Sequence, residues 1–211
     1  MCNVIPGILE KSWEDVEAKI TLLSSFTKTL HIDVIDGKLV NNLTFLDPAP
    51  FAKYKDQFLL EVHLMVEEPV NYLKPFAAAG FKRFLGQVEK MSDQDEFVAE
   101  GELLGEVGLA LDGPTDLSAI KVSYDDLDLV LFYISEKIGF SGPEMLPERL
   151  EKVKAFRAKS NIPIEVDGGI NDATILLAKE AGATRFVSTS FISSSLDPKT
   201  SYDKLASLII G

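Results

Sequence analysis

Cysteine is almost absent from this chain, which contains Cys2 and no second cysteine among its 211 residues. An intramolecular disulfide and a cysteine-rich zinc module are therefore both excluded. Long apolar runs are also missing, since the longest, residues 129–134, is far shorter than the roughly 20 residues that cross a bilayer. The first residues lack the basic and apolar regions of a secretory signal. We therefore expect a cytoplasmic protein that does not bind a membrane.

Positive charge is scarce, because 21 Lys and Arg stand against 33 Asp and Glu, and the net charge is −12. Such a chain repels a polyanion at long range, so we expect no nucleic-acid partner. A small anionic substrate stays compatible with this charge, because a few backbone amides and one metal ion can outweigh the global field. The remaining composition, 46% hydrophobic and 26% charged, is that of a globular protein large enough to bury a core.

Short apolar runs alternate with longer amphipathic segments along the chain. Strands are predicted at residues 4–9, 30–35, 59–66, 83–87, 107–111, 127–134, 164–166 and 185–188, and helices at 13–23, 50–55, 69–79, 93–104, 117–122, 147–159, 173–181 and 201–210. This alternation indicates a parallel sheet with helices outside it. An open doubly wound sheet and a closed barrel compete. Eight units and the lack of a Gly-x-Gly-x-x-Gly turn favour the barrel, a single (β/α)8 TIM-barrel domain over residues 1–211.

Polar residues lie near the carboxyl ends of several predicted strands, where parallel barrels form their active sites. His31 and Asp33 are two residues apart and therefore share one face of their strand, while the third strand supplies His63 and the seventh Asp167. Two imidazoles and two carboxylates suit a divalent ion such as Zn²⁺, Fe²⁺, Mn²⁺ or Co²⁺. Each histidine alone fits a hydrogen-bonded core residue equally well, so these residues leave both alternatives open.

Glycine and hydroxyl residues follow the last three predicted strands. They are Gly139, Phe140, Ser141 and Gly142, then Gly168 and Gly169, and finally Thr189 and Ser190. Loops at these places in a barrel commonly bind phosphate through backbone N–H groups, and glycine lets the backbone approach an anion. Tight turns without a ligand would need the same glycines, so phosphate binding and a purely structural role both stay open.

Several motifs together resemble the ribulose-phosphate 3-epimerase family, in order and with similar spacing. They are His31-Ile32-Asp33-Val34-Ile35-Asp36-Gly37, Val62-His63-Leu64-Met65-Val66, Gly108-Leu109-Ala110-Leu111, Gly139-Phe140-Ser141-Gly142 and Glu165-Val166-Asp167-Gly168-Gly169-Ile170. The resemblance covers almost the whole chain. It implies a TIM barrel that inverts carbon 3 of a pentulose 5-phosphate with one divalent metal ion, and the expected pair is ribulose 5-phosphate and xylulose 5-phosphate.

The resemblance also implies a role for individual residues. The metal ligands would be His31, Asp33, His63 and Asp167, and Asp33 and Asp167 would also be the catalytic acid and base. Two such groups are needed because inversion removes a proton from one face of a carbon and returns one to the other face. Met65 would cover the intermediate. The residues that bind the substrate or its phosphate would be Gly139, Phe140, Ser141, Gly142, Gly168, Gly169, Thr189 and Ser190.

The chain departs from the family pattern around the substrate. Gly7 stands where the first strand usually carries serine, Gln87 where the fourth usually carries histidine, and Thr189 where the last phosphate loop usually carries glycine. The methionines usual on the second and sixth strands correspond to Ile35 and Ile134, which would keep the lid over the substrate apolar.

These departures leave alternatives to the pentulose substrate. One is a 3-epimerase of another phosphorylated ketose, such as a hexulose 6-phosphate, and another is a non-catalytic barrel that binds a sugar phosphate. A decarboxylase or aldolase of related fold is disfavoured, because no lysine lies between Asp33 and Asp36. The resemblance further leads us to expect a phosphorylated ketose as the ligand and a homo-oligomer.

Overall fold

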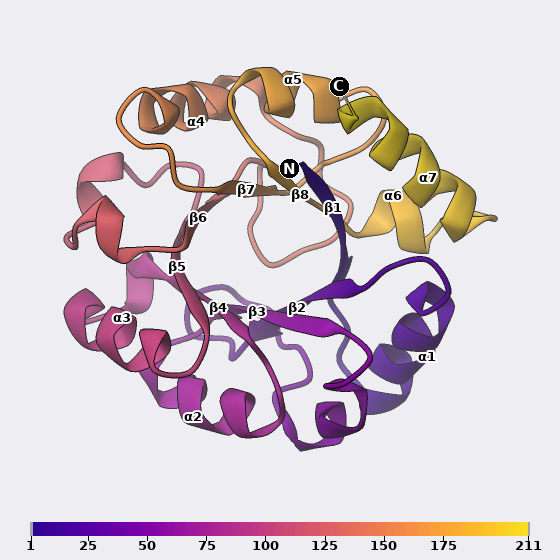
Figure 1. Cartoon of the computed structure of the whole chain (residues 1–211), viewed down its shortest axis with the longest axis horizontal. Coiled ribbons are helices and arrows are strands. Elements are labelled where there is room, and N and C mark those ends of the chain that lie inside the picture. The colour runs from indigo at the N-terminus through magenta and orange to yellow at the C-terminus, as the bar shows by residue number, and fades with distance from the viewer. Residues whose placement is uncertain (1, 211) are drawn as a thin grey trace.

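Eight parallel strands form a closed ring at the centre of the computed structural model, which describes residues 2–210 (Figure 1). The strands are β1 (Asn3–Ile8), β2 (Thr29–Ile35), β3 (Leu59–Met65), β4 (Arg83–Gln87), β5 (Glu106–Leu111), β6 (Leu129–Tyr133), β7 (Ile164–Asp167) and β8 (Arg185–Ser188). Each strand pairs with its neighbour in sequence, and β1 pairs with β8 to close the ring. The predicted TIM-barrel fold is confirmed. Met1 and Gly211, the ends of the predicted domain, lie outside the described residues.

Helices surround the ring of strands. The α-helices are α1 (Trp13–Leu23), α2 (Val70–Ala78), α3 (Gln94–Glu102), α4 (Leu150–Arg157), α5 (Ile175–Glu180), α6 (Ser190–Ser193) and α7 (Pro198–Ile209). Short 3-10 turns are η1 (Ala49–Tyr54), η2 (Val88–Lys90), η3 (Leu117–Ala119), η4 (Tyr124–Asp126) and η5 (Pro147–Arg149). Ser12 caps α1, because its hydroxyl oxygen accepts a hydrogen bond from the Asp15 backbone N–H.

Two of the predicted helices are 3-10 turns rather than α-helices. The predicted helix 50–55 is η1, which is six residues long and carries Pro50 near its start. The predicted helix 117–122 is η3, three residues long, and the Asp116 side chain caps it. Both segments are too short for more than one or two α-helical turns, so the tighter 3-10 hydrogen bonding is adequate. The four-residue helix α6 was not predicted.

The barrel interior is polar on one side and apolar on the other. Leu85, Ala110, Leu129 and Leu131, on the β4, β5 and β6 wall, form an apolar cluster separate from the main core. The strand residues that alternate with the inner ones join a large core between strands and helices, as Ile32 does. His31 and Asp33 are buried on the other wall. The buried polar side chains of the barrel interior are therefore concentrated on β2, β3 and β7.

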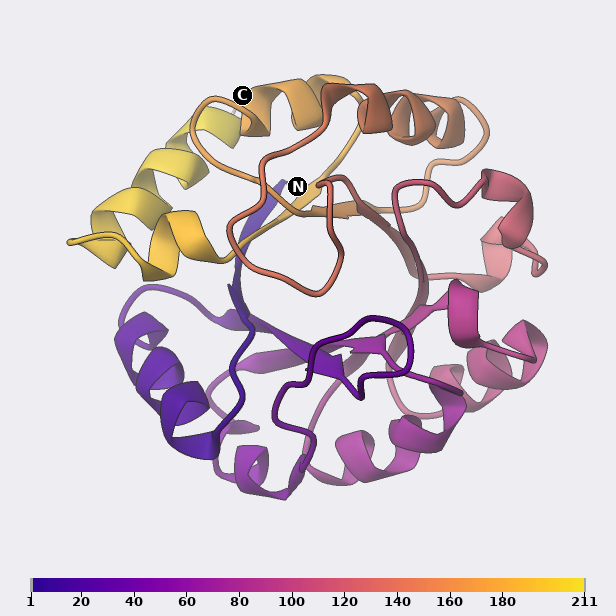
Figure 2. The same ribbon diagram turned by 180° about the vertical axis from the view of Figure 1, so that it is seen from behind.

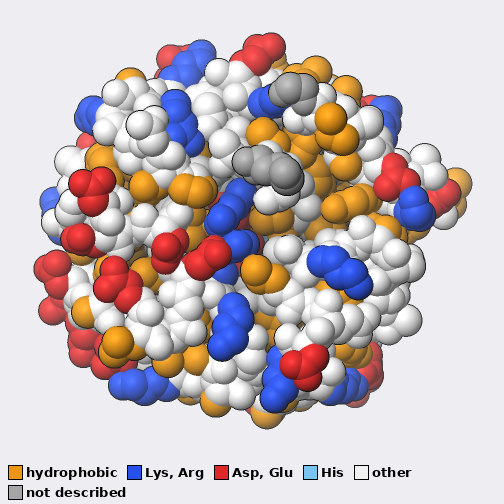
Figure 3. Space-filling view, in the orientation of Figure 1, with side chains coloured by type: hydrophobic (Ala, Val, Ile, Leu, Met, Phe, Trp, Pro, Cys, Tyr) orange, Lys and Arg blue, Asp and Glu red, His pale blue; other side chains and the backbone are white. Residues whose placement is uncertain are grey.

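The two ends of the barrel differ. At one end the loops after β2 and β6 extend across the opening (Figure 2), and Asn42 joins them by donating a 2.7 Å hydrogen bond to the Gly139 carbonyl. The opposite end, seen in Figure 3, has basic and acidic side chains at its centre. There Arg83 and Arg185, the first residues of β4 and β8, both ion-pair with Glu106. Among the helices of residues 2–210, none is long and apolar enough to cross a membrane.

Candidate active site

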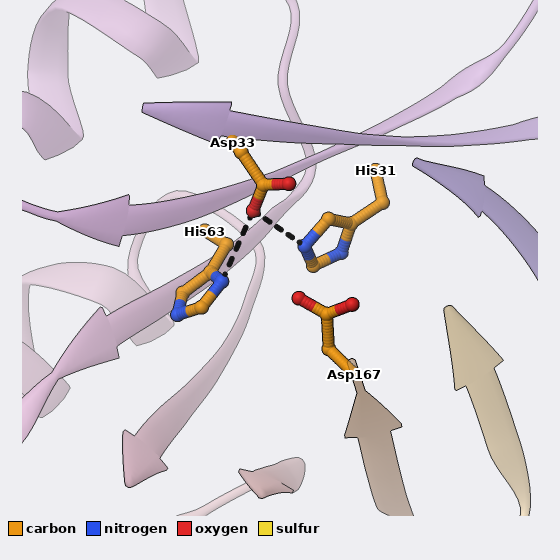
Figure 4. A group of neighbouring side chains, drawn as sticks. All are labelled: His31, Asp33, His63 and Asp167. Atoms are coloured by element: carbon orange, nitrogen blue, oxygen red, sulfur yellow. Dashed lines mark hydrogen bonds and ion pairs between the residues drawn. The ribbon is translucent and has the colours of Figure 1, made fainter. Parts of the chain in front are cut away.

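Four side chains from three strands converge inside the barrel (Figure 4). They are His31, Asp33, His63 and Asp167; all are buried, and each offers one ligand atom within 4.8 Å of the others. His31 and Asp33 are alternate residues of β2, and the strand register places Asp33 beside His63 of β3. Asp167 approaches from β7, on the facing wall. The structure thus brings together the four residues that the strand-end pattern singles out.

Asp33 lies between the two imidazoles, and its Oδ1 is 3.3 Å from Nε2 of His31 and 3.2 Å from Nδ1 of His63. The other nitrogen of each ring has its own partner. Nδ1 of His31 is 2.6 Å from Glu61 Oε1, and Nε2 of His63 is 2.7 Å from Gln87 Oε1. A carboxylate or amide oxygen accepts, so these outer nitrogens carry the hydrogens and the inner nitrogens can offer a lone pair to the cluster.

A second layer of charge lies beneath the cluster. Glu61 binds both Nδ1 of His31 and, through a 2.6 Å ion pair, Arg83. Glu165 is also buried: its Oε1 is 3.3 Å from His31 Nδ1, yet neither of its oxygens has a hydrogen-bond partner of good geometry. Neither Glu61 nor Glu165 was given a role on the basis of the sequence. A signal was present, because Glu61 and Glu165 each precede a cluster residue by two positions and so share its face.

The carboxyl groups of this region differ in acidity. Burial raises the pKa of Asp167 to about 6, and the neighbouring charge of Asp33 adds to the shift. Burial acts on Asp33 too, but the charge and hydrogen bond of His31, with those of His63, outweigh it and lower the Asp33 pKa to about 2. The pKa of Glu165 is raised to about 7 by burial and by Glu61. Environment thus separates the two aspartates into a stronger and a weaker acid.

The donor set fits a divalent cation. The four carboxyl groups nearest to the imidazoles are buried, and like charges at this range cannot all ionise without a compensating cation. Arg83 compensates Glu61 through its ion pair. Burial lowers the pKa of His31, but Asp33, Glu165 and Glu61 outweigh it and raise that pKa well above 6.5. Surroundings that retain a proton so strongly also favour a metal ion at the imidazole lone pairs. Nitrogen and oxygen donors in this number suit Zn²⁺, Fe²⁺, Mn²⁺ or Co²⁺.

A cavity of about 250 Å³ opens above the two aspartates. Asp33 and Asp167 lie at its inner end, and the glycine-rich loops after β6, β7 and β8 form its rim. Among its lining residues are those that the resemblance assigned to the substrate, namely Met65, Gly139, Phe140, Ser141, Gly142, Gly168, Gly169, Thr189 and Ser190. His31 and His63 lie deeper and do not line the cavity. The predicted metal and substrate residues therefore share one continuous site.

A sequence comparison identifies the family. A family model described as "Ribulose-phosphate 3 epimerase family" matches residues 3–193. The chain belongs to the ribulose-phosphate 3-epimerase family. A relative from Oryza sativa subsp. japonica, "Ribulose-phosphate 3-epimerase, cytoplasmic isoform", is 35% identical over 204 residues, 93% of this chain and 89% of the relative. "Ribulose-phosphate 3-epimerase" of Bacillus subtilis is 31% identical over 215 residues, covering 97% of this chain and 98% of the relative.

Solved structures of similar shape agree with the family's barrel. The 3-keto-L-gulonate-6-phosphate decarboxylase from Vibrio cholerae superposes with a TM-score of 0.73 at 13% identity, covering 97% of this chain and 95% of that one. The 3-hexulose-6-phosphate synthase from Salmonella typhimurium gives a TM-score of 0.72 at 12% identity, covering 99% and 98%. At this identity the likeness establishes the fold alone.

One expectation drawn from the family pattern is wrong. Ile134 was expected in the apolar lid, but it packs in the core between strands and helices. Tyr133, its neighbour, faces the cavity instead and packs with Ile35 and Met65. Tyr133 pairs in register with Asp167, which fixes its inward direction. A shift of one position along a strand exchanges its two faces, which is why the expected residue and its neighbour point in opposite directions.

The Tyr133 hydroxyl holds the loop that follows β6. It donates a 2.8 Å hydrogen bond to the Lys137 carbonyl and lies 3.4 Å from the Phe140 carbonyl. Burial and the charge of Asp167 raise the Tyr133 pKa, so the phenol stays protonated and remains a donor. The Lys137 ammonium lies 4.0 Å from the centre of the Phe140 ring. These contacts fix one rim of the cavity from below.

Proposed function

We propose that this chain is a metal-dependent sugar-phosphate 3-epimerase that interconverts D-ribulose 5-phosphate and D-xylulose 5-phosphate. The observation that carries the proposal is the pair Asp33 and Asp167. They come from facing walls of the barrel, with different acidities, at the inner end of one cavity. Membership of the family supports the reaction and the substrate class.

His31, Asp33, His63 and Asp167 would hold the metal ion. A divalent cation bound there supplies positive charge that stabilises negative charge developing on the substrate oxygens. The protein's own contribution is to orient the donors, through Glu61 behind His31 and Gln87 behind His63. Cobalt, zinc, iron and manganese would be compared by reconstituting chelated protein with one metal at a time and measuring turnover.

Proton transfer at carbon 3 would be shared by the two aspartates. One carboxylate removes the proton from its side of the carbon, which leaves an enediolate, and the other carboxyl group returns a proton from the opposite side. Before one direction of the epimerisation, Asp167, whose pKa is raised to about 6, is suited to hold the proton that it will donate. Asp33 is then suited to be the carboxylate that accepts a proton from carbon 3. In the reverse direction the roles exchange. Met65 and Tyr133 would exclude water from the carbanionic intermediate.

Backbone N–H groups at the rim would bind the phosphate. Gly168 and Gly169 have φ of 102° and 74°, and a Cβ at either position would lie within 2.6 Å of Ser135 or 2.2 Å of Met145. Only glycine fits there, so the turn after β7 brings its backbone close to the cavity. Gly142, with φ of 103°, and Ser190 line the same rim. Neutral amide donors would bind a dianion without adding further charge to this acidic chain.

Proton exchange provides the decisive test. Metal-loaded protein would be incubated with ribulose 5-phosphate in D₂O and followed by NMR, with chelated protein as the control. We expect deuterium at carbon 3 and the appearance of xylulose 5-phosphate, both dependent on metal. Asp33→Asn and Asp167→Asn should each lower turnover by roughly a thousandfold. Unchanged epimerisation in either variant would overturn the two-carboxyl assignment.

A second candidate is 3-epimerisation of a longer phosphorylated ketose, such as a hexulose 6-phosphate. The replacements at Gly7, Gln87 and Thr189, all within the barrel interior or cavity wall, favour it. A panel of ketose phosphates would decide between the two, because the preferred substrate has the highest kcat/KM. Binding without exchange for every member of the panel would instead indicate a non-catalytic sugar-phosphate-binding barrel.

A further inference from the structure

Gly7 and Thr189 compete for the same space on the inner wall of the barrel. They lie on β1 and just after β8, whose pairing places Pro6 beside Ser188. A Cβ built on Gly7 would be 2.2 Å from Thr189 Oγ1 and 3.2 Å from Val187 Cγ1. The Thr189 side chain therefore occupies the position that a side chain at residue 7 would take, and only one of the two residues can carry one.

The Thr189 hydroxyl lies over Gly7 of β1. On its other side, Gly7 pairs in register with His31 of the cluster. The hydroxyl that covers Gly7 is thus one strand away from His31. The Thr189 carbonyl is engaged by the Ser193 N–H and hydroxyl, at 2.9 and 2.8 Å, which fixes the residue. Within residues 2–210, no protein group hydrogen-bonds the Thr189 hydroxyl, and Thr189 lines the cavity.

We propose that the Thr189 hydroxyl is a substrate-binding group that reaches across from β8 over Gly7 and forms a hydrogen bond with a hydroxyl group of the sugar, not with its phosphate. A hydroxyl both donates and accepts, which matches a polyol. This inference rests on the proposed function, in that the ligand is taken to be a ketose phosphate.

The first test compares Thr189→Val, which keeps the shape and removes the hydroxyl, with Thr189→Ser, which keeps the hydroxyl. Metal-loaded proteins would be titrated calorimetrically with a pentitol 5-phosphate, the reduced analogue of the substrate, and separately with inorganic phosphate. Thr189→Val should weaken pentitol 5-phosphate binding about tenfold, as expected for one lost hydrogen bond, and phosphate binding by less than about twofold. Thr189→Ser should bind both as the unmodified chain does. Equal weakening for both ligands would overturn the proposal.

The second test moves the hydroxyl from one strand to the other. Gly7→Ser alone should weaken pentitol 5-phosphate binding, because its Cβ collides with Thr189. In the double variant Gly7→Ser with Thr189→Gly the collision is removed and a hydroxyl is again present, so the affinity for pentitol 5-phosphate should recover. The matched control is Gly7→Ala with Thr189→Gly, which removes the same collision but supplies no hydroxyl, and it should bind about tenfold more weakly than the Ser/Gly pair.

The outcomes separate this inference from the proposed activity. A Ser/Gly pair that binds no better than the Ala/Gly pair would contradict a hydroxyl contact. Failure of the unmodified chain to bind pentitol 5-phosphate would overturn the inference as well. A chain that binds pentitol 5-phosphate and responds to the exchange as expected, yet does not epimerise ribulose 5-phosphate, would overturn only the proposed function.

Discussion

Gln87 Oε1 accepts a 2.7 Å hydrogen bond from Nε2 of His63. An amide oxygen can only accept, so this contact places the ring hydrogen on Nε2 and leaves the lone pair of Nδ1 directed at Asp33 and the cluster. The Gln87 Nε2 group is buried without a hydrogen-bond partner. Burying this amide nitrogen without a partner costs folding free energy. The role that the geometry supports for Gln87 is to orient a metal ligand.

Replacing Gln87 should weaken metal binding. Gln87→Leu removes the acceptor behind His63, and we expect the affinity for Zn²⁺ to fall about ten- to a hundredfold. Gln87→Glu keeps an acceptor and should retain affinity. Competition with a chromogenic chelator would measure both. Gln94→Leu is a matched control, because Gln94 is also a buried amide in hydrogen bonds, but with Ala119 and Lys121. Equal loss in the two leucine variants would contradict an orienting role for Gln87.

Metal removal should lower thermal stability as well as activity. A cation that binds the folded cluster and not the unfolded chain stabilises by about 4 kcal/mol at a thousandfold excess over its Kd. For a chain of this size that corresponds to about 10 °C in Tm. Calorimetry with and without a chelator would measure the shift. Asp167→Asn, which removes one ligand, should show a smaller shift in Tm on chelation. A Tm that does not change on chelation in either protein would argue against a metal at this cluster.

The pH dependence of stability should report the buried Glu165. Its pKa in the folded protein is raised to about 7 from an ordinary 4.5, so the folded chain holds this proton where the unfolded chain has released it. The free energy of unfolding should therefore fall as pH rises from about 4.5 to about 7. Asp167, with a pKa raised to about 6, contributes in the same direction.

Glu165→Gln tests this dependence. In chelated protein at pH above 7, where Glu165 is charged, the variant should be more stable than the unmodified chain by about 3 kcal/mol. Below pH 4.5 the difference should largely vanish. Urea unfolding at several pH values measures both, with Glu102→Gln on the exposed surface of α3 as the matched control. A variant less stable than the parent at every pH would show that the Glu165 carboxylate stabilises the fold.

Tyr133→Phe should loosen the rim of the cavity without changing its apolar floor. The variant removes the hydroxyl that donates to the Lys137 carbonyl and keeps the ring beside Ile35 and Met65. We expect KM for the ketose phosphate to rise about three- to tenfold while kcat changes less, because the loop contributes to binding. Tyr124→Phe, whose ring packs on Phe156 away from the cavity, is the matched control. A fall in kcat with KM unchanged would assign Tyr133 to the chemical step.

The sequence pattern predicted the barrel and the cluster for related reasons. Strand and helix periodicities repeat eight times, and the period of two places His31 and Asp33 on one face without any knowledge of the fold. Closure of the ring then brings Asp167 to them. Periodicity does not fix the exact position of each residue along its strand, and the family pattern therefore suggested Ile134 for the lid where Tyr133 lies.

Contacts between strands that are distant in sequence could not be predicted from the sequence, for a different reason. The pairing of β1 with β8 depends on the register of the closed ring, and nothing local to Gly7 indicates that Thr189 lies beside it. The buried ion pair of Glu61 with Arg83 also depends on the register of neighbouring strands. Taken alone, each is only a charged residue in an apolar strand. The local sequence pattern shows which face of a strand a residue occupies, whereas its partners on other strands depend on the register of the folded barrel.

Closure of the ring by its first and last strands also sets an order on biosynthesis. β2 and β3 leave the ribosome early, carrying His31, Asp33 and His63, whereas Asp167 arrives only when β7 is made and Thr189 only after β8. Until then β1 has an unpaired edge, and the emerging half-barrel exposes both that edge and its apolar inner wall. A nascent chain can thus present three of the four ligands well before the cavity has its last wall.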